Sequence, residues 1–390
     1  MSIQLTVYPD ECDTFGHLNQ AAYLALFERA RWALLAAGPG MDAFERAGIW
    51  PAVRRATIDY HAGAWPGDVL EFGIDVLQRG RTSFTLRQRA VRPRDQRLIA
   101  TVDTVFVCID KDERPVAVPE EILAAMGGAR RVALTTGVTL AVEDRGGGGT
   151  PLLLVHGYPL DRTLWRAQVN DLRGRRVIAP DLRGSGESDA APDATTLAAH
   201  ADDLAALLDA LQVERCVFCG LSMGGYIAFE FMRRHPQRVA ALVLMDTRAG
   251  ADSDEGKAGR NAAIVTARDK GAVAIADAMA AKLFAADVDP LVRAAVVAQM
   301  GRSAVPGIVA ALGAMRDRAD ATALLSSIDV PTLVVVGAED RLTPPEAARA
   351  MVDAISGAEL VVIDGAGHLP PVERPVETTA ALQHFLDRVV

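Results

Sequence analysis

The pattern of hydrophobic and polar positions changes once along the chain, near residue 130. Up to about residue 128 it predicts a strand at the N-terminus, one long helix over residues 19–37, and strands near residues 57–61, 69–77, 82–91 and 98–109. Strands that follow one another across short turns form an antiparallel sheet, and a single long helix must bury its apolar face on that sheet. Residues 1–128 are therefore predicted to form an α+β domain.

From about residue 132 the pattern is of another kind. Continuous apolar runs occur at residues 152–155, 176–179, 216–219, 240–245, 332–336 and 359–363, with helical segments between most of them. Such runs are typical of a parallel sheet covered by helices on both faces. Residues 126–131 are a short Gly-containing linker, and residues 247–327 hold Ala-rich helical segments without strands. We expect an α/β domain over residues 132–390 with a helical cap at about 247–327.

A tight turn within the second domain carries a candidate nucleophile. Gly220-Leu-Ser222-Met-Gly224 follows the buried run at 216–219 and precedes a helical segment. Strand, sharp turn and helix are the context that G-x-S-x-G requires, because glycines on either side let the strand and helix pass closely. The Ser222 hydroxyl is then expected at a helix N-terminus, where the helix dipole favours developing negative charge.

A serine hydroxyl is a weak nucleophile and needs a neutral imidazole within hydrogen-bond reach. His368, in Gly365-Ala-Gly367-His368, follows the last predicted strand and is the expected base. Asp340 follows the strand at 332–336 and is the expected acid that orients it. Asp246, after the strand at 240–245, is the alternative acid.

Two backbone amides are expected to stabilise the oxyanion. One is the N–H of Met223, directly after Ser222, and the other is the N–H of Tyr158, in the loop after the strand at 152–155. His156, in the same loop, is interpreted as a residue that braces the loop by hydrogen bonds.

Residues 132–390 resemble the α/β-hydrolase superfamily. The similarity is carried by the Ser222 and His368 motifs and by three further segments, namely His156-Gly157, Asp181-Leu-Arg-Gly-Ser-Gly-Glu-Ser188 and Gly337-Ala-Glu-Asp340. The resemblance implies an eight-stranded, mostly parallel sheet and favours the carboxylesterase and enol-lactonase group. Relatives that dehalogenate or open epoxides carry Asp at the elbow, so Ser222 argues against both reactions. Carbon–carbon bond hydrolases and cofactor-free haloperoxidases use the same triad and stay open.

Residues 1–128 resemble the hotdog-fold acyl-CoA thioesterases, through Asp13-Thr-Phe-Gly16-His17-Leu-Asn19-Gln20 and the loop at 60–68. The resemblance implies that Asp13 acts as base or nucleophile on a thioester, while the amide near Gln20 polarises its carbonyl. Asp13 as a residue that only orients its loop is the alternative. His17 either contacts substrate or satisfies the loop, and Asn19 is expected to cap the helix. Sites between two subunits are typical of the family, which implies at least a homodimer.

Composition and charge narrow the possible partners. The chain has 390 residues and a formal net charge of −9, and no Lys/Arg block forms a basic tail, which argues against nucleic acid. Four scattered cysteines do not form a disulfide framework, and the sequence shows neither a signal peptide nor a membrane span. We expect a cytoplasmic protein with no metal or other cofactor.

The expected substrate is a small ester or an acyl-CoA. Trp165 either lines the acyl pocket or packs in the core, and the cap methionines are an equally weak sign of an apolar pocket. Four hypotheses follow: an esterase or thioesterase acting at Ser222, a bifunctional acyl-CoA hydrolase acting mainly at Asp13, a hydrolase whose hotdog layer only dimerises, and a ligand receptor that kept its triad.

Overall fold

The computed structural model describes residues 2–36, 40–95, 97–118, 129–172, 174–190 and 195–389. The chain divides into two compact units, Met1–Gly128 and Ala129–Val390. Part of the predicted linker, residues 126–128, lies outside the described residues. Each unit has its own sheet and its own hydrophobic core.

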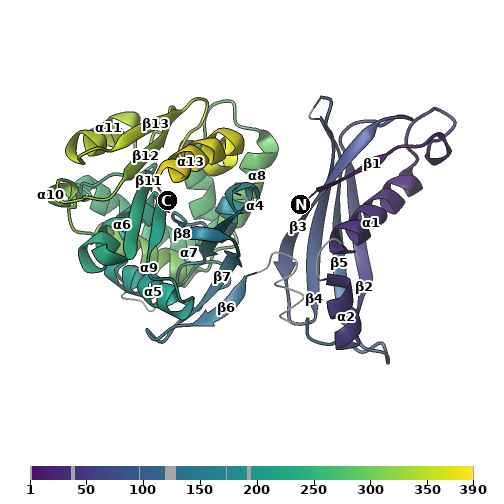
Figure 1. Cartoon of the computed structure of the whole chain (residues 1–390), viewed down its shortest axis with the longest axis horizontal. Coiled ribbons are helices and arrows are strands. Elements are labelled where there is room, and N and C mark those ends of the chain that lie inside the picture. Colours follow the sequence, from purple (N-terminus) through teal and green to yellow (C-terminus); the bar gives the residue numbers. More distant parts are fainter. Residues whose placement is uncertain are drawn as a thin grey trace. The chain divides into compact units, whose positions relative to one another are not determined.

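The first unit is an antiparallel sheet with one long helix along it (Figure 1). Its sheet order is β1-β3-β4-β5-β2, which confirms the predicted hotdog-like fold. The helix turns Leu26, Phe27 and Ala30 into the core against Leu70 and Phe72. Its elements are β1 (Ser2–Thr6), the 3₁₀ turn η1 (Pro9–Glu11), α1 (Gln20–Ala36), α2 (Gly40–Ala47), β2 (Trp50–Tyr60), β3 (Val69–Arg79), β4 (Ser83–Arg92) and β5 (Arg97–Ile109).

Two elements of this unit differ from the sequence prediction. Helix α2 was not predicted, and strand β2 begins at Trp50, earlier than the run at 57–61 indicated. Most side chains of β2 are exposed, so the strand lacks the alternation of buried and exposed positions that β4 and β5 show. The sequence therefore carried too little signal to mark its start.

The second unit is an eight-stranded sheet in the order β13-β12-β11-β10-β8-β9-β7-β6. The pairings from β13 to β9 are parallel, and β7 and β6 join antiparallel. The strands are β6 (Arg130–Ala133), β7 (Thr139–Arg145), β8 (Gly148–Val155), β9 (Arg175–Pro180), β10 (Cys216–Leu221), β11 (Val239–Met245), β12 (Thr332–Gly337) and β13 (Glu359–Ile363). The α/β-hydrolase fold is confirmed, while the two antiparallel strands were not predicted individually.

Helices cover both faces of this sheet, so successive strand residues enter different cores (Figure 1). In β10, Cys216 and Phe218 belong to one core and Val217 and Cys219 to the other. The two cysteines of β10 therefore lie on opposite faces of the sheet. Burial raises the pKa of the Cys216 thiol to about 12. The helices outside the cap are α4 (Arg166–Asp171), α5 (Leu197–Ala210), α6 (Met223–Arg234), α11 (Pro345–Ala354), α12 (Pro370–Glu373) and α13 (Pro375–Val389), with the 3₁₀ turns η2 (Arg162–Trp165) and η3 (Pro236–Arg238).

Between β11 and β12 the chain forms only helices. These are α7 (Asp254–Leu283), which bends at Gly271, α8 (Pro290–Met300), α9 (Val305–Arg316) and α10 (Thr322–Leu325). They occupy the segment for which the sequence predicts a cap, and every residue of the segment is described.

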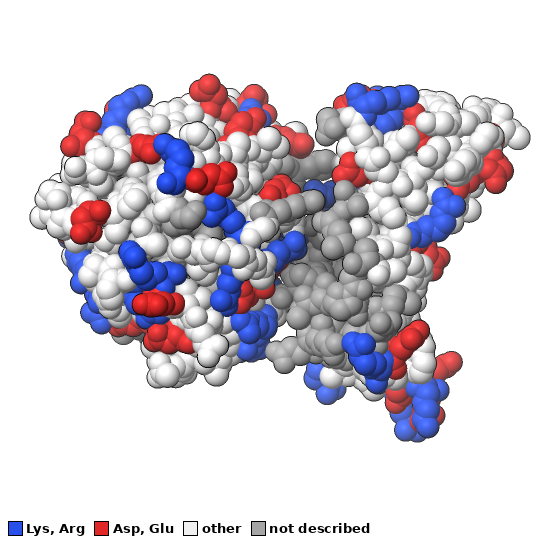
Figure 2. Space-filling view, in the orientation of Figure 1, with Lys and Arg blue, Asp and Glu red and all other residues white. Residues whose placement is uncertain are grey.

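Two further observations concern the surface. On the face shown in Figure 2, acidic and basic side chains are interspersed, and its described residues form no continuous basic patch. No single described helix is long and apolar enough to cross a membrane; one pair, Pro290–Met300 with Val305–Arg316, passes that test together but is bent by 95°.

Candidate active site

Ser222 sits in a strained turn between β10 and α6. Its φ is 54° and its ψ is −112°, a conformation that residues with a side chain rarely adopt. The close approach around it explains the flanking glycines. A Cβ atom on Gly220 would lie 2.3 Å from the carbonyl oxygen of Gly224, and one on Gly224 would lie 2.3 Å from that of Val155. Only glycine fits at either position.

The structure brings Ser222, His368 and Asp340 together. The Oγ atom of Ser222 lies 2.9 Å from Nε2 of His368, and Nδ1 of His368 lies 2.8 Å from Oδ2 of Asp340. Both His368 and Asp340 are buried, whereas Ser222 is partly exposed. In this arrangement His368 can accept the Ser222 proton at Nε2 while its Nδ1–H donates to Asp340.

Asp340 is held as a carboxylate by four donors. Oδ1 accepts the N–H groups of Leu342 and Thr343 at 2.8 and 3.1 Å, and Oδ2 accepts the Thr343 hydroxyl at 2.6 Å and His368. Burial alone would raise the pKa of Asp340, but the bonds from His368 and Thr343 outweigh burial and hold that pKa below its usual value. Asp340 therefore keeps the charge that stabilises a protonated His368.

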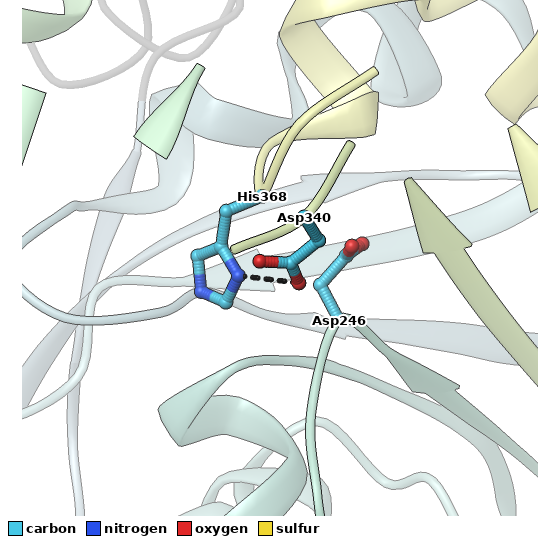
Figure 3. A group of neighbouring side chains, drawn as sticks. All are labelled: Asp246, Asp340 and His368. Carbon is cyan, nitrogen blue, oxygen red and sulfur yellow. Dashed lines mark hydrogen bonds and ion pairs between the residues drawn. The ribbon is translucent and has the colours of Figure 1, made fainter. Parts of the chain in front are cut away.

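The alternative acid, Asp246, occupies a different place. It lies at the end of β11 beside Asp340, as Figure 3 shows, and no hydrogen bond joins it to His368. Of the two acids weighed from the sequence, Asp340 is thus the partner of His368. The structure nevertheless packs both carboxyl groups into one buried space, which sequence reasoning did not foresee.

The loop that holds His368 is anchored by groups that no sequence motif marks. The carboxylate of Glu373 accepts the N–H groups of Gly367 and Leu369 on one oxygen, at 3.1 and 3.0 Å, and that of Ala285 on the other, at 2.7 Å. The N–H of His368 donates to the Leu283 carbonyl at 2.7 Å. Because Leu283 ends cap helix α7 and Ala285 follows it by two residues, these hydrogen bonds join the cap to the histidine loop.

The expected oxyanion donors flank Ser222. Met223 begins α6, and its N–H has no backbone acceptor among the described residues. The Tyr158 N–H also lacks one there, and the loop before it approaches the elbow so closely that a Cβ atom on Gly157 would lie 3.1 Å from Cβ of Ser222. Neither N–H group is thus used by a backbone carbonyl of the described residues, and the loop that precedes Tyr158 lies against the Ser222 turn.

His156 braces this loop, as its interpretation from the sequence proposed. Its Nδ1 lies 2.9 Å from its neighbour's carbonyl oxygen, that of Gly157, and its Nε2 accepts the Leu182 N–H at 3.0 Å. Burial lowers the pKa of His156, so the ring is neutral and fits these two bonds. Trp165, for which the sequence left a place in the acyl pocket and a place in the core open, is fully buried in one cluster with Leu164 and Val169. A large aromatic side chain leaves the same sequence signal in a pocket and in a core.

In the first unit, Asp13 lies in the loop before α1. Its Oδ1 accepts the N–H groups of Phe15 and His17 at 2.9 and 3.1 Å, and its other oxygen has no hydrogen-bond partner among the described residues. The exposed His17 residue packs its ring edge-on against Trp65, with ring centroids 5.6 Å apart. Asn19 caps α1 by accepting the Ala21 N–H at 2.8 Å, and Gln20 is the exposed first residue of the helix.

Comparison with known proteins agrees with both domains. The family model described as "alpha/beta hydrolase fold" matches residues 150–375, and that of the "Thioesterase-like superfamily" matches residues 7–126. The chain belongs to the α/β-hydrolase family and carries a thioesterase-like domain before it. It is a hydrolase, as the esterases and enol-lactonases among its relatives are.

Three relatives illustrate the similarity. A solved thermophilic esterase from Thermogutta terrifontis is 43% identical, covers 67% of this chain and 99% of its own, and has a TM-score of 0.65. The enol-lactonase from Burkholderia xenovorans LB400 is 30% identical over 66% of this chain and 100% of its own, with a TM-score of 0.62. The 2-hydroxymuconate semialdehyde hydrolase of Pseudomonas sp. (strain CF600) is 30% identical over 66% of this chain and 93% of its own.

Proposed function

We propose that this protein hydrolyses carboxylic esters or thioesters through an acyl-enzyme on Ser222. The observation that carries the proposal is the continuous relay from the Ser222 hydroxyl through His368 to Asp340, at 2.9 and 2.8 Å. The similarity to the thermophilic esterase and the enol-lactonase supports the same class of substrate.

The chemistry follows from the positions of the groups. Ser222 Oγ attacks the acyl carbon while its proton passes to Nε2 of His368, and the N–H groups of Tyr158 and Met223 stabilise the oxyanion. His368 then returns the proton to the leaving alkoxide or thiolate as the acyl–oxygen or acyl–sulfur bond breaks. A water, deprotonated by His368, attacks the acyl carbon, and His368 returns the proton to Ser222 Oγ as the bond between Oγ and the acyl carbon breaks and the acid is released. The triad supplies base and nucleophile, so no cofactor enters the proposal.

A p-nitrophenyl ester series of increasing acyl length tests this function. Ser222→Ala is expected to lower kcat for these oxygen esters by at least about a thousandfold, because the variant loses the hydroxyl that His368 activates. Ser326→Ala, which truncates an exposed serine at the end of α10, is the matched control and is expected to keep full activity. Ester cleavage that survives Ser222→Ala would reject the proposal, and tight ester binding without turnover in the wild type would favour the receptor hypothesis.

A second activity, acyl-CoA hydrolysis at Asp13, is favoured by one specific observation. The Asp13 carboxylate is held by two N–H groups through one oxygen and has its other oxygen without a partner in the described part of the chain. An oriented carboxylate of this kind can serve as base or nucleophile on a thioester, which needs only modest activation.

Asp13→Asn separates this activity from a purely structural role. Asn keeps an acceptor for the Phe15 and His17 N–H groups but removes the charge. Acyl-CoA cleavage that survives Ser222→Ala and is lost in Asp13→Asn would establish the second site, with Asp10→Asn, at an exposed neighbouring residue, as control. If acyl-CoA cleavage is lost in Ser222→Ala and kept in Asp13→Asn, the first unit does not catalyse this reaction.

The proposal includes a homodimer formed through the first unit. Strand β2 is 11 residues long and ends the sheet, so its outer edge has no strand partner among the described residues. It exposes Trp50, Val53 and Tyr60, which invites pairing with another strand. If the β2 strands of two copies paired antiparallel with Thr57 opposite Thr57, each Arg55 would lie opposite the partner's Asp59. That charge match favours a second copy of this chain as the occupant.

We also place the protein in the cytoplasm. The four cysteines, all among the described residues, are free thiols, which suits a reducing compartment. The interspersed charges of Figure 2 give no support for nucleic acid as a partner, and small esters or acyl-CoA remain the proposed substrates.

A further inference from the structure

The buried carboxyl group of Asp246 has no place in the relay described above. Asp246 directly follows β11, has a φ of 42° and is fully buried. A carboxyl oxygen of Asp246, a carboxyl oxygen of Asp340 and a ring nitrogen of His368 all lie within 4.8 Å of one another. Figure 3 shows the two carboxyl groups side by side. Two buried carboxyl groups at such a distance cannot both carry a full charge without a large electrostatic cost.

The hydrogen bonds decide which of the two acids is ionised. Asp340 accepts four donors, two on each oxygen, as an anion does. Asp246 accepts one, the Gly337 N–H at 2.9 Å on Oδ1, while Oδ2 is buried and has no partner among the described residues. Burial and the neighbouring Asp340 charge raise the pKa of Asp246 well above its usual value. The proton of the pair therefore belongs to Asp246.

A cation shared by these three residues is a poor alternative. His368 uses Nδ1 toward Asp340 and Nε2 toward Ser222, so neither ring nitrogen has a lone pair to spare while the relay is intact. Glu373, the other acid that faces this group, already accepts three N–H groups. A proton on Asp246 removes the repulsion between the two carboxyl groups and leaves every hydrogen bond of the triad intact.

We propose that Asp246 is a positioning residue for the triad, one that donates a hydrogen bond from its protonated carboxyl to Asp340 and holds the Gly337 amide with its other oxygen. Gly337 ends β12, and its carbonyl accepts the N–H of Asp340 at 3.1 Å. Asp246 thus fixes both the turn that carries Asp340 and the carboxylate itself, which keeps Asp340 aimed at Nδ1 of His368. The inference rests on the proposed role of Ser222.

The substitution Asp246→Asn tests directly whether Asp246 is protonated in the folded protein. Asn is a neutral isostere that keeps the acceptor for Gly337 and offers an N–H to Asp340, so kcat is expected within about threefold of wild type and the acidic limb of kcat/KM is expected unmoved. An ionised Asp246 would favour a protonated His368, and its replacement by Asn would move that limb to lower pH. Infrared difference spectra of wild type against Asp246→Asn are expected to show one protonated carboxyl lost in the variant.

Asp246→Ala removes both hydrogen bonds and is expected to lower kcat about tenfold or more, with KM within about twofold, because Asp340 loses its alignment. Asp329→Asn, at an exposed position, is the control for the loss of one carboxylate. A shifted acidic limb in Asp246→Asn, or no carboxyl band lost, would overturn the inference. If activity also survives Ser222→Ala, the proposed function fails instead, so the two failures are distinguishable.

Discussion

Gly157 and Ser222 are in closer contact than a side chain on Gly157 would allow. A Cβ atom at Gly157 would lie 3.1 Å from Cβ of Ser222 and 3.0 Å from Cδ2 of Leu221. The loop that supplies the Tyr158 N–H therefore rests directly on the nucleophile turn. This contact sets the distance between the proposed oxyanion donor and the hydroxyl.

Gly157→Ala is expected to push the loop away from Ser222 by a few tenths of an ångström. A misplaced oxyanion donor weakens the transition state more than substrate binding, so kcat should fall about tenfold to a hundredfold while KM changes little. Gly313→Ala, in helix α9 where a Cβ atom meets nothing, is the matched control and should keep wild-type kinetics. If Gly157→Ala keeps the wild-type kcat, the N–H of Tyr158 is not an oxyanion donor.

Asp340→Asn is expected to lower kcat by about a thousandfold or more, because an amide cannot hold His368 with its Nδ1 protonated or stabilise the imidazolium. Glu339→Gln provides the control. Glu339 accepts the Ala286 N–H at 3.0 Å, which Gln can still do, and it does not contact His368. A comparable loss of kcat in both variants would show that the loop as a whole, and not the carboxylate of Asp340, supports His368.

A third prediction concerns stability and pH. His200, in α5, is fully buried without a hydrogen-bond partner on either ring nitrogen among the described residues, and burial lowers its pKa to about 3. The unfolded chain takes up this proton near pH 6.5, whereas the folded chain does not until near pH 3, so stability is lost as the pH falls below 6.5.

Replacing His200 by Leu removes this part of the pH dependence. Between pH 7.5 and 5.5, wild type is expected to lose about 1.4 kcal/mol more unfolding free energy than His200→Leu. Urea unfolding at the two pH values measures the difference, with His384→Gln, at an exposed position of α13, as control. Equal pH dependence in wild type and His200→Leu would mean that His200 takes up its proton over the same pH range in the folded and the unfolded chain, which would contradict the prediction.

The sequence predicted the elements that local chemistry determines. The spacing of Gly220 and Gly224 is typical of a sharp turn between a strand and a helix. Ser222, Asp340 and His368 each follow a strand of the sheet, in the order that the fold requires. Asp246 was considered only as a substitute for Asp340, because its proximity to that residue arises from pairing of β11 with β12 across the cap insertion. The bracing by Glu373 depends on backbone amides, which any sequence supplies, so it left no signal.

Strands β6 and β7 were not predicted from the sequence for a related reason. β6 is four residues long and largely exposed, and β7 mixes buried apolar positions with Glu143, Asp144 and Arg145. Neither shows the continuous apolar run of a parallel strand or a clean alternation. β7 is held in the sheet by its pairing with β9, and β6 by its pairing with β7.

A charge swap tests the proposed dimer. Arg55→Asp would place like charges opposite each other in the pairing about Thr57 and is expected to weaken the dimer, whereas Arg55→Asp with Asp59→Arg restores the match. Sedimentation velocity over a range of protein concentrations measures both. A wild-type chain that sediments as a monomer, or a double variant as weak as the single one, would reject this pairing.

The role of Ser222 is tested most directly by covalent labelling with a fluorophosphonate, followed by intact-mass measurement and peptide mapping. We expect one phosphonyl group per chain, located on Ser222, and loss of ester hydrolysis in proportion to labelling. Full labelling with undiminished ester hydrolysis, or a label on a residue other than Ser222, would contradict it.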